Sequence, residues 1–486
     1  MKLTTRLRDF ISDHAPMFRR RSSTIQITPF VDRIPQELLL YIFQTIVNAN
    51  PRKANILIQV CSKWRNIALS SGSLWSRVIL TYPIYPRQFT GVSARLARSG
   101  SYPLDILCDF RDPSWDWEEE NHAFRWQEME PVMRLLLVHV ARWWRFELLT
   151  DTWSPIFTFL WYTRRVQDMP MLENLSLSRC NLYFAARGHI FQPIALRQPI
   201  PLFGGIFLSK LKSVSLVGVH IDWQPPSLRN LTELTLKFQA SNVMPTLPQF
   251  DAIFQACQGL LRLTIFGWGP IFNPSTPIAN GQLRLPLLQY FSFGFLDIPY
   301  SLQLLSLFDF PSLNELILED ISKAVSPGEL QDATDFMLWF LSTTSPRNFR
   351  RSIYLPIHQL QSLEIHSICS DERVMASFFQ ESASLKRLGL FDVPTNFLAL
   401  FLLQKDTVAL CPQLQELYCQ DMDPAIVLEV VSSRISVGGL LKKATADFLR
   451  EPRPSTGSIV DQKLRKLGIN ILGKLGSESS DSGMSD

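Results

Sequence analysis

The 486-residue chain lacks the short motifs that mark most kinds of reactive site. None of its seven cysteines forms a CxxC pair, and its seven histidines include no HExxH arrangement. No GxxxxGK[ST] loop, GxSxG turn or GxGxxG turn occurs either. These motifs mark zinc and thiol redox sites, phosphate-binding loops, serine hydrolases and dinucleotide-binding folds. We therefore expect no cofactor, no bound metal and no enzymatic activity.

Long apolar runs and a dominant charge are also missing. No stretch reaches the roughly 18 apolar residues of a membrane-spanning helix, and the longest candidate, MRLLLVHVARWW, contains Arg142. The formal net charge is +4, and the basic residues do not gather into a long stripe. We therefore expect neither a membrane nor a nucleic-acid partner. No signal-peptide pattern is present, so we expect an intracellular protein, cytoplasmic or nuclear, with reduced cysteines.

What the sequence does contain is enough apolar material for a large core. Apolar residues make up 46% of the chain and charged residues 19%, with 33 Phe and 12 Trp, which is typical of a folded body. The two ends lack this pattern. Residues 1–28, with a basic run at Arg19 to Arg21, predict a disordered arm, and residues 451–486 predict a mostly disordered tail.

From residue 101 to residue 450 one apolar phrase recurs, L-x-x-L-x-L with substitutions. Six of the eight intervals between successive copies are 20 to 29 residues long, which is the period of leucine-rich repeats. Two further segments, PLDILCD at 103 and RFELLTD at 145, look like strands of the same kind. The nine copies are LENLSL at 172, LKSVSL at 211, LTELTL at 231, LLRLTI at 260, LQYFSF at 288, LNELIL at 313, LQSLEI at 360, LKRLGL at 385 and LQELYC at 414.

The alternating leucines of this phrase place one face of a short strand in a core that neighbouring repeats share. We therefore predict an α/β fold, in which residues 101–450 form a curved leucine-rich-repeat solenoid with a parallel sheet on its concave face. The nine strands should be neighbours in chain order, because no single core set can be buried alone. The alternative is a doubly wound α/β fold, which would show longer Val/Ile runs and a glycine-rich first turn.

The strand positions between the leucines should face away from the core, on the concave sheet. They carry mixed charges and aromatic rings, which suit the binding of a protein or peptide surface. We expect a protein substrate to contact some of them, while the others are merely solvated. The candidates are Lys237, Arg262, Phe266, Glu315, His366, Arg387, Phe391 and Tyr418.

An acidic and aromatic run, WDWEEENH at 115–122, lies between the two additional strands. Such a run is typical of a solvated helix start, and it could instead contact a basic partner. The sequence favours the first interpretation and leaves the second open.

Residues 29–80 form a separate amphipathic segment. A first helix, with Pro35 and Glu37 in its first turn, has one apolar face. A second helix should carry Leu57, Val60 and Trp64 at helical spacing. So short a segment cannot bury this much apolar surface within itself. We therefore expect it to dock on the surface of a partner helix.

This segment resembles the F-box. The stretches IPQELLLYIF at 34, VCSKWRNIAL at 60 and SLW at 73 match the family pattern LP-x-E-L-L-x-x-I-F … V-C-x-x-W-R-x-I-A … L-W, with Ile34 in place of the usual Leu. The resemblance implies that residues 29–80 are an all-α F-box unit that binds a Skp-type adaptor, which bridges to a cullin–RING scaffold. It implies an adaptor contact through Ile34, Pro35, Leu38, Leu39, Ile42, Phe43, Val60, Trp64, Leu74 and Trp75.

The order of the parts resembles the F-box–LRR class of ubiquitin-ligase substrate receptors, and the body resembles fungal F-box proteins. The resemblance implies a non-catalytic subunit of an SCF-type ligase. The F-box would recruit the adaptor, and the repeats would hold a protein substrate close to the conjugating enzyme. The alternative is a leucine-rich-repeat interaction adaptor that acts outside any ligase.

Overall fold

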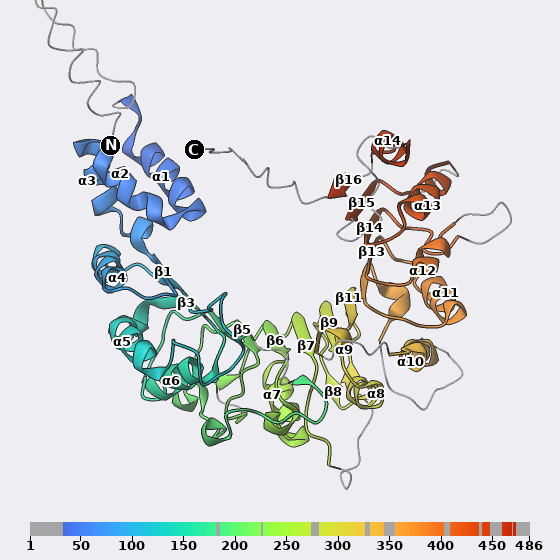
Figure 1. The fold of residues 1–486 in the computed structure, drawn as a ribbon, viewed down its shortest axis with the longest axis horizontal. Coiled ribbons are helices and arrows are strands. Elements are labelled where there is room, and N and C mark those ends of the chain that lie inside the picture. Colours follow the sequence, from blue (N-terminus) through green and yellow to red (C-terminus); the bar gives the residue numbers. More distant parts are fainter. Residues whose placement is uncertain are drawn as a thin grey trace, which may run out of the picture. The chain divides into compact units, whose positions relative to one another are not determined.

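A computed structural model describes the chain in ten stretches: residues 33–180, 185–224, 227–273, 281–325, 331–344, 355–402, 409–436, 440–447, 459–468 and 470–472. The predicted arm at 1–28 lies outside these residues, as does the tail from 473 onward. Two compact units are present, Met1–Leu74 and Trp75–Asp486. The described part of the first unit is helical, and the second unit contains a large parallel sheet (Figure 1). The protein is therefore mixed α/β, as predicted.

From residue 33 onward, the first unit contains three α-helices, α1 (Gln36–Ala49), α2 (Ala54–Val60) and α3 (Ser62–Ser70). The prediction of one continuous second helix was wrong, because the chain breaks at Cys61. The backbone of Cys61 is extended, with φ −155° and ψ 172°, and its sulfur accepts a hydrogen bond from the Trp64 amide at 3.5 Å. Cys61 thus caps α3 and cannot also continue α2.

Fourteen strands of the described chain form one parallel sheet in chain order. The nine strands predicted from the leucine phrase, β4 to β7, β9 and β11 to β14, are confirmed as parallel neighbours in the predicted order. A separate parallel pair joins β8 (Leu283–Arg284) to β10 (Phe308–Asp309). The strands of the large sheet are β1 (Arg77–Thr81), β2 (Leu104–Asp109), β3 (Trp143–Thr150), β4 (Asn174–Arg179), β5 (Ser213–Val217), β6 (Glu233–Lys237), β7 (Arg262–Phe266), β9 (Tyr290–Phe295), β11 (Glu315–Asp320), β12 (Ser362–His366), β13 (Arg387–Phe391), β14 (Glu416–Gln420), β15 (Lys443–Asp447) and β16 (Asn470–Leu472).

The register of this sheet stacks the apolar positions of successive strands. Leu216 of β5 pairs with Leu236 of β6, and Leu236 pairs with Ile265 of β7. All three side chains are buried in one continuous core. Burying an aliphatic side chain of this size contributes about 1.5–3 kcal/mol. Each strand therefore depends on its neighbours for most of its stability.

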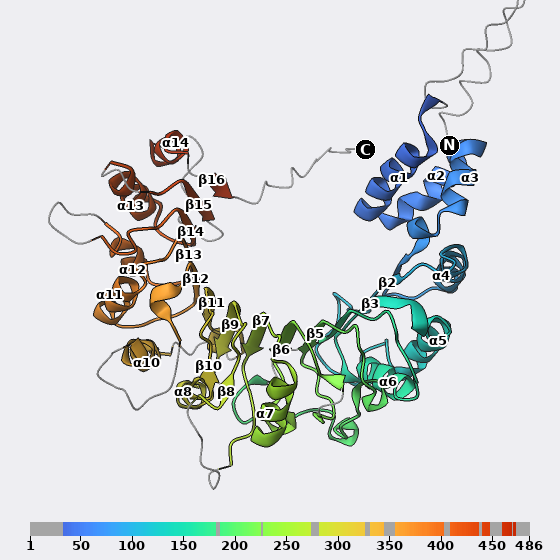
Figure 2. The same cartoon turned by 180° about the vertical axis from the view of Figure 1, so that it is seen from behind.

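Helices cover one face of the sheet, and Figures 1 and 2 show α4 to α8 and α10 to α13 along that face. The strand residues that alternate with the core positions form the opposite face, which we call the open face. The helices of the second unit are α4 (Pro86–Arg98), α5 (Trp126–Leu137), α6 (Trp153–Thr163), α7 (Leu247–Ala256), α8 (Ile298–Ser306), α9 (Ser322–Val325), α10 (Thr334–Thr344), α11 (Glu372–Glu381), α12 (Thr395–Ala399), α13 (Pro424–Ser436) and α14 (Ile459–Lys466).

The sheet extends beyond the range of 101–450 predicted for it. It begins with β1, before residue 101, and ends with β16, beyond residue 450. Helix α14 and strand β16 also lie inside the tail that was expected to be mostly disordered. The repeat pattern could not predict these strands, because β1 (RVILT) and β16 (NIL) are shorter than the leucine phrase and contain no copy of it.

A buried histidine, His220, is expected to make the stability of the second unit depend on pH in the acid range. The His220 ring stacks on Trp153, with 4.6 Å between the ring centroids. Its Nε2 donates to the carbonyl oxygen of Arg197 at 3.0 Å, and its Nδ1 has no hydrogen-bond partner in the described part of the chain. Burial lowers the pKa of His220 to about 4 from the usual 6.5. Protonation of the ring would turn Nδ1 into an N–H donor, and this nitrogen has no acceptor in the described part of the chain.

Between pH 6.5 and about 4, the unfolded chain binds a proton that folded His220 rejects, so the free energy of unfolding falls as the pH drops. We expect this residue alone to remove about 3 kcal/mol over that range. His220→Phe should keep the stacking and flatten this part of the pH dependence, at the cost of the Arg197 hydrogen bond. Urea unfolding of both proteins between about pH 4 and pH 7 measures the difference. If the free energy of unfolding depended equally steeply on pH in both proteins, the predicted role of His220 would be contradicted.

Candidate functional site

The inner face of α1 forms the core of the first unit. Leu39, Phe43 and Val47 are buried, and the Phe43 ring lies 4.8 Å from the Trp64 ring of α3. The Gln44 side chain donates to the Ser73 hydroxyl at 3.2 Å, which ties α1 to the end of the unit. Among the described residues of this unit, packing therefore uses one side of the first helix.

The other side of α1 exposes apolar side chains to solvent. Leu38, Tyr41 and Ile42 are 56%, 69% and 42% exposed. Their spacing of three and four residues places them side by side on one face of the helix. We call these three residues the α1 stripe. On α2, Ile56 and Val60 are 60% and 54% exposed. Exposed apolar surface of this extent on so small a unit is typical of an interaction site.

The ten residues expected at an adaptor contact therefore differ in accessibility. The exposed ones are Pro35, Leu38, Ile42 and Val60, and the half-buried ones are Ile34 and Trp64. The buried ones are Leu39, Phe43, Leu74 and Trp75.

Phe43 and Trp75 are the main departures from the expected surface. Phe43 is fully buried, because it packs on Trp64 inside the helical unit. Trp75 is 1% exposed, and its ring lies beneath the guanidinium groups of Arg95 and Arg98, at 5.4 and 4.6 Å. Both support the fold, so neither side chain presents a contact surface.

Two exposed apolar residues, Tyr41 and Ile56, were not among the predicted contacts. Tyr41 stands three positions after Leu38, so helical spacing alone could have included it. Ile56 precedes the family-like stretch at 60 and had no motif to mark it.

On the second unit, the eight predicted substrate contacts all occupy open-face positions of the sheet. The register aligns Arg262 of β7 with Tyr290 of β9 and Glu315 of β11. It also aligns Lys237 of β6 with Phe266 of β7. The alternation of the strands was therefore predicted correctly at these positions.

These eight residues lie in separate local pairs along the sheet rather than in one cluster. Arg387 and Glu315 form an ion pair at 3.0 Å. The His366 and Phe391 rings stack with 4.2 Å between centroids, and the Lys237 ammonium lies 4.0 Å from the centre of the Phe266 ring. Arg262 lies over Tyr290, and Tyr418 accepts a hydrogen bond from Lys443. The open face thus offers an extended surface rather than a single pocket.

Phe266 is not available on this surface, because it is only 6% exposed. It belongs to a small apolar cluster with Ala185, Leu296 and Ile321. Gly294, beside it in the sheet, leaves room for the ring, since a β-carbon there would lie 2.8 Å from Phe266. Phe266 therefore supports the shape of the open face and does not contact solvent.

Three open-face residues were not among the eight: Tyr290 and Lys443, which take part in these contacts, and Glu319, which interacts electrostatically with Lys237. Tyr290 lies in the copy LQYFSF, so the alternation could have identified it. Lys443 lies on β15, which no leucine phrase marks. Glu319 of β11 is half-buried, and burial raises the pKa of its carboxyl, while burial lowers the pKa of Lys237. These two charged groups are therefore partly desolvated on the open face.

Several kinds of chemistry find no support in the described residues. No group of three His, Cys, Asp or Glu side chains there could hold a metal ion. Burial raises the pKa of Cys411 and Cys419 to about 12, so both stay protonated at neutral pH and are poor nucleophiles. All seven cysteines are free thiols, with Cys108, Cys257, Cys411 and Cys419 buried and the others half-buried.

Within the stretches that the structure describes, no helix has the length and apolar character to cross a bilayer.

Comparison with known families identifies the helical unit. Residues 31–81 match the F-box-like family, which covers the three helices, Leu74 and Trp75, and strand β1. No curated protein matches the chain. The match supports an F-box protein and is consistent with the adaptor-binding role that F-box domains have in SCF-type ligases.

Proposed function

We propose that this protein is the substrate-recognition subunit of an SCF-type ubiquitin ligase. The observation that carries the proposal is the exposed α1 stripe on a helical unit that matches the F-box-like family. A Skp-type adaptor covers Leu38, Tyr41 and Ile42 and bridges to a cullin–RING scaffold. Buried Leu39 and Phe43 hold α1 in the orientation that presents this stripe.

The parallel sheet is the second part of the proposal. Its units of strand and helix, repeated in chain order, support its assignment as a leucine-rich-repeat solenoid. A protein substrate lies on the open face, where accessible charged and aromatic residues alternate along the strands. The pairs Arg387–Glu315 and His366–Phe391 are contact candidates. The charges of Arg387 and Glu315 are already matched within the chain, so this pair favours specificity more than affinity.

The protein contributes no catalytic group of its own in this proposal. It raises the effective concentration of a substrate lysine near the conjugating enzyme that the scaffold carries. Ubiquitin transfer is then the work of other subunits. The buried, protonated cysteines Cys411 and Cys419 agree with this, since a thiol ligase needs an accessible thiolate.

The experiment that tests the proposal is reconstitution from purified parts. The full-length chain is mixed with a Skp-type adaptor and a cullin–RING scaffold, and the complex is isolated by size exclusion. We expect all components to elute together. Binding of the adaptor without the cullin would favour the alternative, an interaction adaptor outside any ligase. Failure to bind the adaptor would overturn both the ligase role and the adaptor contact.

A further inference from the structure

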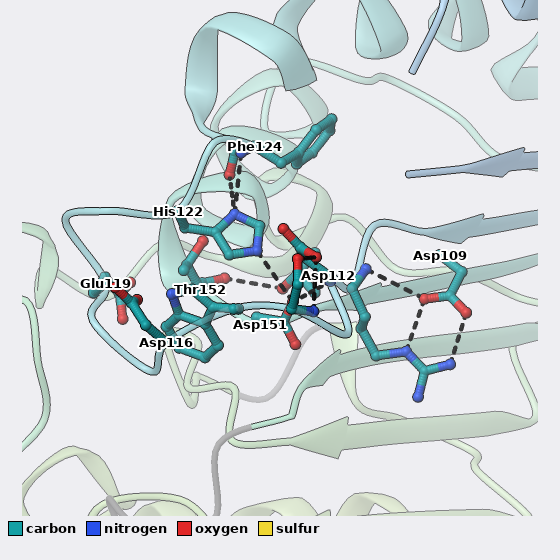
Figure 3. A network of polar contacts seen from close by, with 12 residues as sticks. Asp109, Asp112, Asp116, Glu119, His122, Phe124, Asp151 and Thr152 are labelled. Atoms are coloured by element: carbon teal, nitrogen blue, oxygen red, sulfur yellow. Dashed lines mark hydrogen bonds and ion pairs between the residues drawn. The ribbon is translucent and has the colours of Figure 1, made fainter. Parts of the chain in front are cut away.

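The acidic and aromatic run at 115–122 forms a loop, so its interpretation as a helix start was wrong. The chain leaves β2 at Asp109, and α5 begins only at Trp126. The loop lies at the carboxyl ends of β2, β3 and β4, near Asp109 and Asp151 (Figure 3). Cys180, which follows β4, lines the same pocket as these two residues. Loops at this edge of a parallel sheet commonly carry binding residues.

Two polar clamps hold the loop in place. Glu119 forms an ion pair with buried Arg179 and also accepts a hydrogen bond from the Trp153 amide at 2.6 Å. His122 Nε2 lies 3.1 Å from the Asp151 carboxylate. The same carboxylate accepts a hydrogen bond from the backbone amide of Asp112 at 2.6 Å, and Figure 3 shows this contact. Glu119 and His122 therefore have structural roles. Trp115 supports them, because its ring packs edge-on against the His122 ring with 5.4 Å between the centroids and its indole N–H donates to the Glu118 carbonyl at 2.8 Å.

Trp115 and Trp117 line a pocket of about 380 Å³ beside these clamps. The centroids of their rings are 5.4 Å apart, and Trp117 is 68% exposed. The backbone of Trp117 has φ 69°, a left-handed conformation that costs energy for a bulky side chain. Such strain persists where the surrounding structure fixes it, and it is frequent at ligand sites. The clamped loop thus presents a large ring to solvent instead of burying it.

The charges that line the pocket leave an excess of negative charge. Asp109 is neutralised by Arg111, which donates two hydrogen bonds to it at 2.7 and 2.6 Å. Asp112 and Asp151 remain. His122 lies 3.1 Å from Asp151 and also interacts electrostatically with Asp112, but a single imidazolium would offset only one of the two carboxylates. Hydrogen bonds from Ser114 hold the pKa of Asp112 below its usual value, so this carboxyl is ionised at neutral pH. An anion would meet these carboxylates, with the Arg111 guanidinium already engaged. A cation is the matching ligand.

We propose that this pocket binds an arginine side chain of a protein partner, with the guanidinium on the face of Trp117 and Asp112 as its counter-ion. A planar guanidinium can stack on an indole ring and donate to a carboxylate at the same time, whereas an ammonium group is a compact, strongly hydrated charge. If the partner is a substrate of the ligase, that identification rests on the proposed function. The binding of arginine by the pocket does not.

The test uses the full-length protein and four labelled hexapeptides that differ at one central position, which is Arg, Lys, citrulline or Glu. Citrulline keeps the shape of arginine without its charge. We expect the Arg peptide to bind in fluorescence anisotropy and the citrulline peptide to bind at least tenfold more weakly, with the Lys peptide in between. Trp117→Ala and Asp112→Asn should each weaken the Arg peptide roughly tenfold, the size of a desolvated cation–π contact.

Trp126→Ala is the matched control, because Trp126 is 53% exposed nearby but does not line the pocket. It should leave the binding of the Arg peptide unchanged. Equal binding of the Arg and citrulline peptides, unchanged binding by the Trp117 variant, or no binding at millimolar peptide would overturn the proposal. Cullin capture is measured on the same preparations. Arginine binding without cullin capture would support the pocket proposal and contradict the ligase role. Cullin capture without arginine binding would support the ligase role and contradict the pocket proposal.

Discussion

Replacing Leu38 and Ile42 together by alanine is expected to weaken adaptor binding about a thousandfold. Both side chains are exposed on the α1 stripe, and anchors of this kind cost roughly 2 kcal/mol each when truncated. Two such losses multiply to about three powers of ten in the dissociation constant. Surface truncation costs little stability, so circular dichroism and the melting temperature should stay near those of the unchanged protein. Isothermal titration with the purified adaptor measures the effect.

Two comparison variants make this result specific. Leu338→Ala removes a similarly exposed side chain from α10 of the second unit and should leave adaptor binding unchanged. Phe43→Ala should also lose adaptor binding, but together with about 3–5 kcal/mol of stability, because Phe43 is fully buried. Full adaptor binding by a well-folded double variant would remove the α1 stripe from the proposed interface.

The strand order was predictable because one pattern fixes it many times over. Each copy of the leucine phrase buries residues such as Leu216 and Leu236 against its neighbours, so only chain-order stacking satisfies all copies. The same logic fails at the ends of the sheet. Strand β1 follows the F-box-like helices directly, and β16 has three residues, so neither carries a period that sequence reasoning can detect.

The candidate sites were less predictable, because exposure depends on what packs on each face. Leu38, Leu39, Ile42 and Phe43 look equivalent on a helical projection, yet helices α2 and α3 bury only the side that carries Leu39 and Phe43. Phe266 follows the open-face alternation and is nevertheless covered by residues distant in the chain, including Ala185. Spacing assigns a face to a residue, but long-range contacts decide whether that face is accessible.

The 115–122 loop gives the clearest case of this dependence, and a large loss of stability is predicted for one of its substitutions. Glu119→Ala should lower the free energy of unfolding by about 3–5 kcal/mol, because it leaves the Arg179 charge buried without its carboxylate. The Arg179 side chain is 1% exposed and the Glu119 side chain 22%. The change also removes an acceptor from the Trp153 amide in the first turn of α6. Urea unfolding measures the loss.

A second substitution separates the buried charge from the other contacts of Glu119. Arg179→Met in the Glu119→Ala background removes the uncompensated charge, so it should recover part of the lost stability rather than add to the loss. Glu120→Ala, one position away and exposed, should change the free energy of unfolding by less than about 0.5 kcal/mol. Additive losses in the double variant would show that the ion pair does not hold the loop. Recovery would show that the loss in Glu119→Ala arises mainly from the buried Arg179 charge that has lost its carboxylate, and only in smaller part from the other contacts of Glu119.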